Sequence, residues 1–300
     1  MASECSGTIF ATAVVRPVAK SSPGSGADLP DLSLIVSVYN KPEILRLVLA
    51  ACERQSFRRF EVIIGDDGSG PAVKDVLREV EAAFSFPVVH LWHEDRGWRK
   101  NIMLNNAIRE ASSDHLVFID GDCLPSRHFL ADHWENREPG KTLLGRRVMM
   151  SRRWSEQLTV ERVRSGWFEG IGMKELMESF RGELSHLEDG IRIPSSLMRK
   201  ALRRKARGML GSNFSVAKEH MLAINGFDEL YDGPGCGEDT DIEYRLSLIG
   251  VSGVSLRNLA IQYHVYHPRT KTSQACWDRF HKVVKGNTDP RCNVGLKKED

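Results

Sequence analysis

The stretch His115–Asp122, HLVFIDGD, decides the fold, because an apolar run of strand length ends in two carboxylates separated by one glycine. Alternate side chains of a strand face the same way, so Asp120 and Asp122 are predicted to point together, and Gly121 lets the backbone approach a ligand closely. Two acids at the end of a buried strand suit a hard divalent cation. The alternative is an ordinary acidic turn, since Asp-Gly is a common turn pair.

Three more apolar runs precede this stretch, and each reads as a buried strand. They are LSLIVSV (32–38), FEVIIG (60–65) and VVHLWH (88–93). Apolar residues then recur at helical spacing after each run, over residues 44–51, 72–83 and 101–111. Strands that alternate with helices predict an α/β fold with a mainly parallel sheet and right-handed connections.

A polar cluster follows each of the four predicted strands. In open α/β sheets, ligands bind outside the carboxyl ends of the strands, so all four clusters are predicted to face one crevice. The chain has no GxGxxG and no GxxxxGK[ST] motif, which excludes the dinucleotide fingerprint and the P-loop. The expected ligand is therefore one held by acids, a metal and a few cations. The clusters are Tyr39-Asn40, Asp66-Asp67, Arg96–Lys100 and Asp120–Asp122.

Composition narrows the class of protein. The 300 residues are 41% hydrophobic, and their formal net charge is +2, which argues against a general nucleic-acid binder. Six cysteines form no CxxC motif, so we expect reduced thiols and a cytoplasmic protein. No apolar run approaches the roughly 18 residues needed to span a membrane. The short apolar patch Thr8–Val15 has no basic residue before it and is a poor secretory signal.

Five motifs in order resemble one known family. IVSVYN (35–40), EVIIGDDGS (61–69) and FIDGD (118–122) resemble the nucleotide-sugar-binding half of the family-2 inverting glycosyltransferases of GT-A fold, whose acidic signature is called DxD. Gly211–Asp228 and Gly235–Leu246, the second reading GCGEDTDIEYRL, resemble the acceptor half shared with β-1,4-galactosyltransferases and chondroitin-type polymerases. The resemblance implies a GT-A fold, a Rossmann-like and mainly parallel sheet flanked by helices, with a helical insertion.

The resemblance implies a nucleotide-sugar donor site at the ends of the first strands. Asp67, or its neighbour Asp66, is expected to bind the uracil ring, because an ionised carboxylate accepts hydrogen bonds from base N–H groups. Tyr39 and Asn40 are expected to line the base and ribose; Asn40 as a helix N-cap is the alternative. Arginine side chains bind phosphate oxygens in bidentate fashion, so the cations of the cluster 96–100 are expected to contact the diphosphate. The alternative is that this cluster is an ordinary solvated charged surface. The remaining residues expected to bind the donor, from this cluster and from the DxD stretch, are Arg96, Arg99, Lys100, Asp120 and Gly121.

A metal ion, Mn²⁺ or Mg²⁺, is expected to bridge the DxD acids and the donor phosphates. Asp122 and Asp120 would supply carboxylates, and the stretch Ala260–His267, AIQYHVYH, would supply a histidine. Its position after the preceding strand favours His264 as the ligand, and His267 is the alternative. A shell that mixes carboxylate and imidazole favours Mn²⁺ over Mg²⁺, because imidazole is the softer ligand.

The base of the reaction is expected at Glu238-Asp239. Helical spacing after these acids places them at a helix amino terminus, where unpaired N–H groups and the macrodipole stabilise negative charge. Inversion by single displacement needs one base to take the proton of the acceptor hydroxyl. We expect Asp239 to be this base and Glu238 to bind acceptor hydroxyls, with Asp241 as the alternative base. Acceptor contacts are expected at Asn213, Trp167 and Asp241.

The chain is predicted to divide into five segments. They are a flexible segment 1–31, a nucleotide-sugar-binding half 32–150, a helical and basic insertion 151–207, an acceptor-binding and catalytic half 208–268, and a C-terminal helix and tail 269–300. Within the insertion, Arg192–Arg207, RIPSSLMRKALRRKAR, is a basic and helix-prone run. Such a run can lie on an anionic membrane surface. Peripheral contact with the inner face of a membrane is therefore one expectation, and a solvated helix beside the cleft is the alternative.

The resemblance implies a metal-dependent hexosyltransferase of polysaccharide biosynthesis. It would move a sugar from a nucleotide-sugar donor, expected to be a UDP-sugar, to a hydroxyl of a glycan or lipid-linked glycan. Two alternatives are a non-catalytic scaffold that binds sugar nucleotide or glycan, and a sugar-nucleotide pyrophosphorylase. The pyrophosphorylase is disfavoured, because it would carry a glycine-rich, arginine-containing loop after the first strand, where this chain has SVYNKPE.

Overall fold

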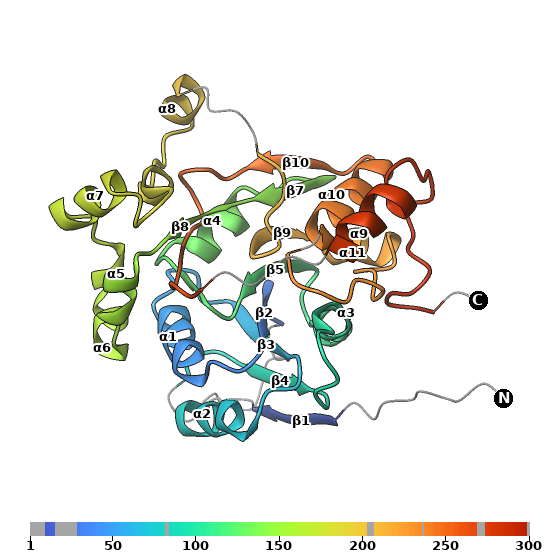
Figure 1. Cartoon of the computed structure of the whole chain (residues 1–300), viewed down its shortest axis with the longest axis horizontal. Helices are drawn as coiled ribbons and strands as arrows, with labels where there is room; N and C mark the ends of the chain where they lie inside the picture. The colour runs from blue at the N-terminus through green and yellow to red at the C-terminus, as the bar shows by residue number, and fades with distance from the viewer. Residues whose placement is uncertain are drawn as a thin grey trace, which may run out of the picture.

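The computed structural model describes residues 10–15, 29–81, 84–202, 207–235, 237–268 and 274–298. Two sheets with helices around them form the body (Figure 1). The large sheet contains, in spatial order, β1 (Phe10–Val15), β4 (Val88–Trp92), β3 (Phe60–Asp66), β2 (Leu32–Val38), β5 (His115–Asp120), β9 (Asn213–Ala217), β7 (Lys141–Leu144) and β10 (Ser252–Ser255). The small sheet contains β6 (Cys123–Pro125), β11 (Ile261–His264) and β8 (Arg146–Met149).

The helices fall into three groups along the chain. Those of the first half are α1 (Pro42–Glu53), α2 (Pro71–Glu81), α3 (Lys100–Glu110) and α4 (Phe129–Glu135). The middle of the chain forms α5 (Arg152–Glu156), α6 (Val160–Ser165), η1 (Trp167–Glu169), α7 (Met173–Phe180), η2 (Leu187–Gly190) and α8 (Ser196–Ala201). The last group is α9 (Lys218–Ala223), α10 (Glu238–Leu248), α11 (Gln274–Arg279) and η3 (Phe280–Val284).

The parallel part of the large sheet confirms the predicted α/β fold. β2 lies parallel to both β3 and β5, and β4 lies parallel to β3. β9 then runs antiparallel to β5 and β7, so the sheet is mixed but mainly parallel. The polar ends of β2, β3, β4 and β5 therefore share one edge, as the sequence predicts.

Both faces of the large sheet are covered by apolar packing. Side chains alternate along a strand, and in β2 the side chains of Leu34 and Val36 pack into the cluster under α1 and α2. Ile35, between them, packs on the other side with α3, α9 and α10. All three side chains have no exposed surface, which explains the uninterrupted apolar run in the sequence.

Gly121 is required where the end of β5 approaches β2. Its N–H donates to the carbonyl of Ser37 at 2.8 Å, and a Cβ placed on it would lie 2.9 Å from that oxygen. Gly121→Ala is therefore expected to lower the free energy of unfolding by about 1–3 kcal/mol, because the overpacked backbone must shift. Urea denaturation measures this change. Gly70→Ala is the control, since its Cβ would meet only Asn40 Oδ1 at 3.9 Å; equal effects would contradict the prediction.

In the turn before α1, Asn40 is not the helix N-cap, which was the alternative considered for this residue. The N-cap is Lys41, with φ of 57° and no side-chain cap hydrogen bond, and Asn40 has φ of 54°. The side-chain oxygen of Asn40 instead accepts a hydrogen bond from Gly70 N–H at 3.2 Å. The turn is thus tied to the loop after β3, which fixes the position of both residues at the edge of the sheet.

Part of the amino-terminal segment expected to be flexible is a strand. Phe10–Val15 form β1, which pairs antiparallel with β4 at the edge of the large sheet. Residues 1–9 and 16–28 lie outside the described residues. The five-segment division stays a prediction, although α5 to α8 all fall within its insertion 151–207.

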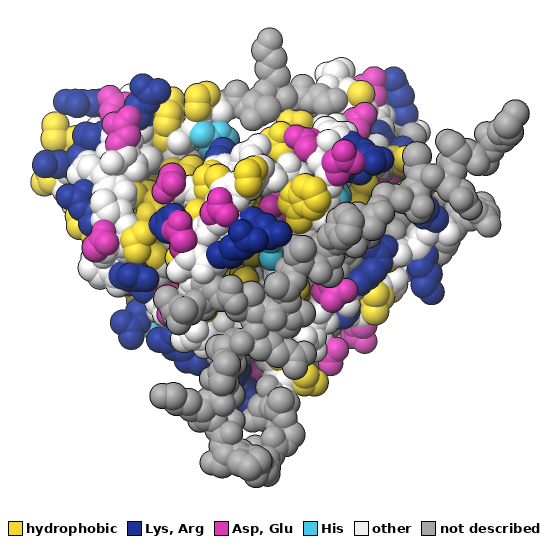
Figure 2. Space-filling model, turned by 90° about the horizontal axis from the view of Figure 1, so that it is seen from below, with side chains coloured by type: hydrophobic (Ala, Val, Ile, Leu, Met, Phe, Trp, Pro, Cys, Tyr) yellow, Lys and Arg dark blue, Asp and Glu magenta, His cyan; other side chains and the backbone are white. Residues whose placement is uncertain are grey.

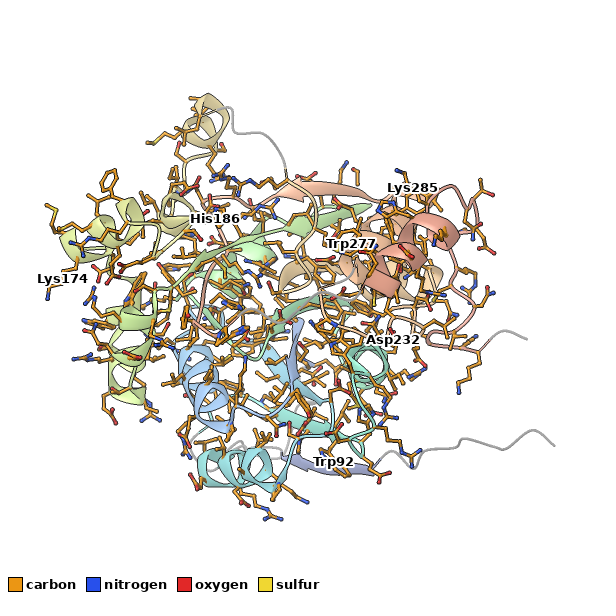
Figure 3. All side chains as sticks on the ribbon, viewed as in Figure 1. Trp92, Lys174, His186, Asp232, Trp277 and Lys285 are labelled. Carbon is orange, nitrogen blue, oxygen red and sulfur yellow. The ribbon has the colours of Figure 1, made fainter. Side chains whose placement is uncertain are left out.

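The insertion lies on the side of the molecule away from the C-terminal helices. Figure 3 shows Lys174 and His186 in the insertion and Trp277 and Lys285 in the C-terminal helices, well separated in the view. Basic and acidic side chains are interspersed on the face seen in Figure 2, in keeping with the net charge of +2. Among the described residues, none of the helices has the length and apolar character required to cross a bilayer.

The cysteines only partly match the expectation of reduced thiols. Cys52, Cys123 and Cys292 are buried free thiols. Cys276 is disulfide-bonded, so the expectation is wrong for this residue. Cys5 and Cys236 lie outside the described residues. The error has a simple cause: without a CxxC spacing, a pairing between distant cysteines leaves no signal in the sequence.

Candidate active site

Pairing within the small sheet brings a late histidine to the DxD stretch. β11 runs antiparallel to β6, with His264 opposite Cys123, and Val265 N–H donates to the carbonyl of Asp122 at 2.9 Å. The strand therefore ends beside the second acid of the DxD stretch, and the three residues that follow carry His267 back over the same carboxylate.

Asp122, His264 and His267 form a cluster of metal-ligand type. One ligand atom from each lies within 4.8 Å of the other two. His264 Nε2 is 3.5 Å from Asp122 Oδ1, and His267 Nε2 is 3.2 Å from Asp122 Oδ2. Burial lowers the pKa of His264 to about 4, so its ring is neutral at pH 7, the form that binds metals.

The cluster passes a test of fit to a divalent cation. The Nδ1 atom of His264 is buried and has no hydrogen-bond partner among the described residues. One carboxylate with two imidazoles is a donor set that suits Mn²⁺. The hydrogen bond with Asp122 raises the pKa of His267, so a metal bound there would displace a proton from that ring. The structure thus brings both histidine candidates to Asp122, rather than one of the two.

Asp120 lies close to Asp122 but has its own set of partners. Its Oδ1 accepts from Lys100 Nζ at 2.6 Å and from Ser37 Oγ at 2.9 Å, and its Oδ2 is 4.0 Å from Arg147 Nη1. Burial would lower the pKa of Lys100, but the negative charges of Asp120 and Glu238 outweigh it and raise that pKa above its usual range. Asp120 is therefore held by cations, and the histidines face Asp122.

Asp122 also has a cation of its own. Lys41 Nζ lies 3.1 Å from Asp122 Oδ2. Burial would raise the pKa of the Asp122 carboxyl, but the hydrogen bond from His267 and the charge of Lys41 hold it well below the usual range. The carboxyl is thus ionised at neutral pH, as a metal ligand must be. Lys41 was not among the predicted site residues, although it directly follows Tyr39-Asn40.

A cavity of about 460 Å³ opens at the carboxyl ends of β2 and β5. Six of the predicted donor residues line it, and so do two residues missed in the sequence, Lys41 and Trp98. The only signal for Trp98 was its place among the cations of the 96–100 cluster. The predicted residues on the wall are Tyr39, Asn40, Asp67, Lys100, Asp120 and Gly121, and Asp122 and His267 complete the end near the metal cluster.

Asp67, and not Asp66, faces this cavity. Asp67 Oδ1 pairs with His93 Nε2 at 2.7 Å, and its Oδ2 accepts from Arg99 N–H at 2.9 Å. Asp66 is 1% exposed, accepts from Ser69 N–H at 2.8 Å and pairs with His90. The two neighbouring acids thus have different roles: Asp66 fixes the turn after β3, and Asp67 is a fixed carboxylate on the cavity wall.

Two of the three predicted phosphate-binding cations point elsewhere. Arg96 Nη2 lies 2.8 Å from Glu94 Oε2, and the Arg99 guanidinium donates to the carbonyl of Glu94. Neither arginine lines this cavity or the neighbouring one beside Arg147. Lys100, from the same cluster, reaches Asp120. The cations at the DxD stretch are therefore Lys100, Lys41 and Arg147.

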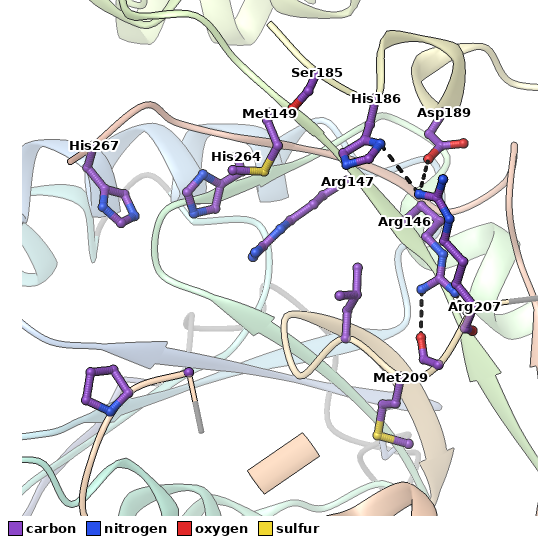
Figure 4. Close-up of a pocket in the computed structure, with 14 residues that line it drawn as sticks. Arg146, Arg147, Met149, Ser185, His186, Asp189, Arg207, Met209, His264 and His267 are labelled. Carbon is purple, nitrogen blue, oxygen red and sulfur yellow. Dashed lines mark hydrogen bonds and ion pairs between the residues drawn. The ribbon is translucent and has the colours of Figure 1, made fainter. Parts of the chain in front are cut away.

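A second cavity, of about 700 Å³, lies on the other side of the metal cluster. His264, His267 and Arg147 line it, and Figure 4 shows Arg147 extending into it from β8. Arg207 lies across the cavity and contacts His186 Nδ1 at 3.5 Å and Asp189 Oδ2 at 4.0 Å. The two cavities share His267 and Pro234, so they meet at the metal cluster.

The predicted base lies at the amino terminus of α10. Asp239 and Glu238 do not line either cavity, although Pro234, in the loop just before them, lines both. Asp239 Oδ2 accepts from Gly211 N–H at 3.1 Å, and its Oδ1 accepts from Thr240 N–H at 2.8 Å. The charges of Glu238 and Asp239 both raise the pKa of Lys100, which places these acids at the same end of the sheet as Asp120. Both side chains are half-exposed.

The structure does not bring the other predicted acceptor residues to the cavities. Asp241 is 1% exposed and pairs with Arg245 Nη2 at 2.5 Å. Asn213 is fully buried, and its Nδ2 donates to the carbonyls of Arg146 and Ala260 at 2.7 and 2.9 Å. Trp167 packs against the core with the guanidinium of Arg162 4.8 Å from its ring. These contacts are structural, so acceptor binding by the three residues has no support in their placement.

Comparison with family models covers most of the chain. Residues 33–193 match the model described as glycosyl transferase family 2. The chain belongs to this family. Residues 194–268 match a second model, described as the N-terminal domain of galactosyltransferase. The family-2 model thus ends within the insertion, and the second model covers β9, α10 and the late histidines.

Curated relatives of this family-2 chain are similar over most of its length. Validoxylamine A glucosyltransferase of Streptomyces hygroscopicus subsp. jinggangensis is 26% identical over 248 residues, which cover 76% of this chain and 54% of that protein. Chondroitin synthase of Escherichia coli is 25% identical over 251 residues, which cover 79% of this chain and 35% of that protein. The chain therefore spans about half or less of the length of these relatives.

Solved structures confirm the fold expected of the family. The mannosyltransferase PcManGT from Pyrobaculum calidifontis, in complex with GDP-Man and Mn²⁺, gives a TM-score of 0.53 at 16% identity and covers 80% of this chain and 58% of that chain. Residues 1–349 of TarS from S. aureus, in complex with UDP, give a TM-score of 0.51 at 16% identity, with 79% and 61% covered. The fold is thus that of the GT-A glycosyltransferases, as predicted.

Proposed function

We propose that this family-2 protein is an inverting, metal-dependent glycosyltransferase that uses a UDP-sugar donor and transfers its sugar to a hydroxyl of a glycan or lipid-linked glycan. The observation that carries the proposal is the convergence of Asp122, His264 and His267 at the junction of two cavities. These three residues would hold a metal where the two cavities meet, so that one cavity could take the donor and the other could take the acceptor.

The donor would occupy the cavity of about 460 Å³ at the carboxyl ends of β2 and β5. Asp67 is fixed there by His93 and Arg99 N–H, and its carboxylate can accept a hydrogen bond from the N–H of a uracil ring. Tyr39 and Trp98 present aromatic surface on the same wall. Lys41 and Lys100 lie beside the DxD acids, where they can contact diphosphate oxygens.

Asp122, His264 and His267 would hold the metal, with Asp120 beside them, and we propose Mn²⁺ over Mg²⁺ because the set includes imidazole. A bound dication supplies electrostatic stabilisation of the charge that develops on a leaving diphosphate. The chain's own contribution is to keep Asp122 ionised and His264 neutral and to orient both through the β6–β11 pairing.

Asp239 is the residue we propose as the base. Two backbone N–H groups hold its carboxylate at the start of α10, where the helix dipole favours the ionised form. An ionised carboxylate can take the proton of an acceptor hydroxyl as the bond to the donor forms. Glu238 is proposed to contact acceptor hydroxyls, and the cavity of about 700 Å³ is proposed to receive the acceptor.

Calorimetric titration of nucleoside diphosphates tests the donor class. UDP is expected to bind in the presence of Mn²⁺ at least about tenfold more tightly than CDP, because Asp67 can accept from the N3–H of uracil and cytosine has no N–H at that position. ADP and GDP complete the panel and test whether the cavity also admits a purine. Asp67→Asn should reduce this preference, whereas Asp66→Asn serves as the neighbour that faces away. Binding of all four diphosphates with equal affinity would contradict the UDP assignment, and binding of none would favour the scaffold alternative.

A further inference from the structure

Helix α7 carries a stripe of large apolar side chains that face solvent. Met173, Leu176, Met177 and Phe180 are 72%, 41%, 48% and 84% exposed. Residues three, four and seven positions apart lie on one face of a helix, so the four side chains form a continuous stripe over the whole of α7. A surface helix ordinarily turns such a stripe toward the core.

The polarity of α7 is inverted, because its acids face the body of the protein. Glu175 and Glu178 are 9% and 5% exposed. Glu178 Oε2 accepts from Ser151 Oγ at 2.7 Å, and Glu178 and Glu175 both pair with the guanidinium of Arg153. Glu175 also accepts from Gly172 N–H at the start of the helix, at 2.9 Å. Leaving a buried carboxylate without its partners is costly, so these contacts hold the apolar stripe outward.

Helix α8 and its flanking residues carry further exposed apolar side chains on the insertion. Leu197 and Met198 of α8 are 78% and 59% exposed, and the neighbouring Ile191 and Leu202 are 55% and 45% exposed. Figure 1 shows α8, the last helix of the insertion, standing off from the body, with α7 at the outer edge of the same side. We call these eight apolar side chains the insertion ridge. Exposed apolar groups gathered in this way mark an interaction surface.

The exposed charged side chains of α7 and of the residue that follows it are positive. Lys174, whose side chain points away from the body in Figure 3, and Arg181 are exposed beside the α7 stripe, while both acids of α7 are buried. The sequence from Ile191 to Gly208 contains seven lysine and arginine residues and no acid; residues 203–206 lie outside the described residues, and Arg192 and Arg207 face Asp132 and Asp189 of the body. An apolar surface bordered by cations matches the acyl chains and headgroups of an anionic bilayer.

We propose that the insertion ridge docks on an anionic lipid bilayer, with Met and Phe side chains of α7 in the interface and the flanking cations on the headgroups. A second copy of the chain is a poorer occupant, because a symmetric contact would bring two cationic surfaces together. α7 contacts η2, and Asp189 of η2 lines the second cavity, so a docked bilayer would lie close to that cavity. This last point rests on the proposed function; bilayer binding itself does not.

Vesicle flotation without donor, acceptor or metal tests the docking. The wild type is expected to float with phosphatidylcholine vesicles that contain phosphatidylglycerol, and at least tenfold less with phosphatidylcholine alone. Met177→Ser with Phe180→Ser should lower the partition coefficient at least tenfold. Leu222→Ser with Leu230→Ser is the matched control, since these leucines are 49% and 50% exposed away from the insertion ridge; its partition should equal that of the wild type. Circular dichroism of each variant checks that the fold is kept.

Three results would overturn the proposal. One is absence of wild-type flotation at low salt, and another is equal flotation of the ridge variant and the matched control. The third is a wild-type dimer in analytical ultracentrifugation that the ridge variant converts to a monomer, which would assign the insertion ridge to a second copy. None of these results bears on nucleotide binding, so the proposed function can stand or fall separately.

Discussion

Asp122→Asn is expected to weaken Mn²⁺-dependent binding of UDP at least about 100-fold and to abolish sugar transfer. The substitution removes the carboxylate that faces both His264 and His267. Loss of a buried charged contact costs about 3 kcal/mol or more, which corresponds to that change in affinity. Calorimetry with UDP, with and without Mn²⁺, measures the change in UDP affinity. A transfer assay with a UDP-sugar measures the loss of sugar transfer.

Three further variants make this result specific. His264→Gln and His267→Gln should each weaken the Mn²⁺ dependence, because both rings lie in the cluster. Asp114→Asn changes the charge equally on the opposite end of β5 and should leave binding unchanged. Full Mn²⁺ dependence in Asp122→Asn would show that the metal is held elsewhere and would contradict the proposed centre.

Asp239→Asn is expected to lower the rate of transfer about 1,000-fold while UDP binds with wild-type affinity. General base catalysis contributes about 10²–10⁴-fold, and the amide cannot take a proton. The amide oxygen can still accept the hydrogen bond from Gly211 N–H, so the loop should keep its position. A comparison of single-turnover transfer rates with calorimetric UDP affinities separates the two effects.

Asp241 provides the contrast for Asp239 in the same helix. Because it is buried and paired with Arg245, Asp241→Asn should destabilise the fold by about 3–5 kcal/mol instead of acting at the site. Thermal unfolding measures that change. If Asp239→Asn kept near-normal turnover and a folded Asp241→Asn lost it, the base would be Asp241 and our assignment would be wrong.

The parallel half of the sheet could be predicted from the sequence because its signals are local. Strands buried on both faces produce continuous apolar runs, and β2, β3, β4 and β5 each begin at the residue where such a run begins. The polar residues at their ends then follow from the rule that parallel strands share one edge. For the same reason the pattern of strands was enough to bring Asp67, Lys100 and Asp120 to one cavity.

The contacts between distant segments could not be predicted in this way. β9 inserts antiparallel beside β5, and β11 pairs with β6, although each pair is far apart in the sequence. Nothing in the local pattern of AIQYHVYH reports that register, so the choice between His264 and His267 stayed open. The directions of the Arg96 and Arg99 side chains could not be predicted for a related reason. In a loop, the sequence does not determine whether a cationic side chain faces the ligand or a neighbouring group of the protein.

Burial explains the errors at Asn213 and Asp241. Motif resemblance indicates that a polar residue matters but does not indicate whether it contacts a ligand or the backbone. Asn213 holds three segments together through the carbonyls of Arg146 and Ala260 and the ring of His133. The orientation of α7 was missed because the sequence MKELMESF has the spacing of an ordinary amphipathic helix, and only tertiary ion pairs decide which face turns outward.

The two lysines at the DxD stretch have a consequence for how the protein folds. Asp120 and Asp122 lie close together in a partly buried site, and two like charges there would repel. Lys100 and Lys41 neutralise one carboxylate each, at 2.6 and 3.1 Å. The chain therefore carries its own counter-ions, so its acids can come together as the sheet assembles without waiting for a dication. The metal would then be exchangeable, and its removal by a chelator would stop Mn²⁺-dependent UDP binding without unfolding the protein.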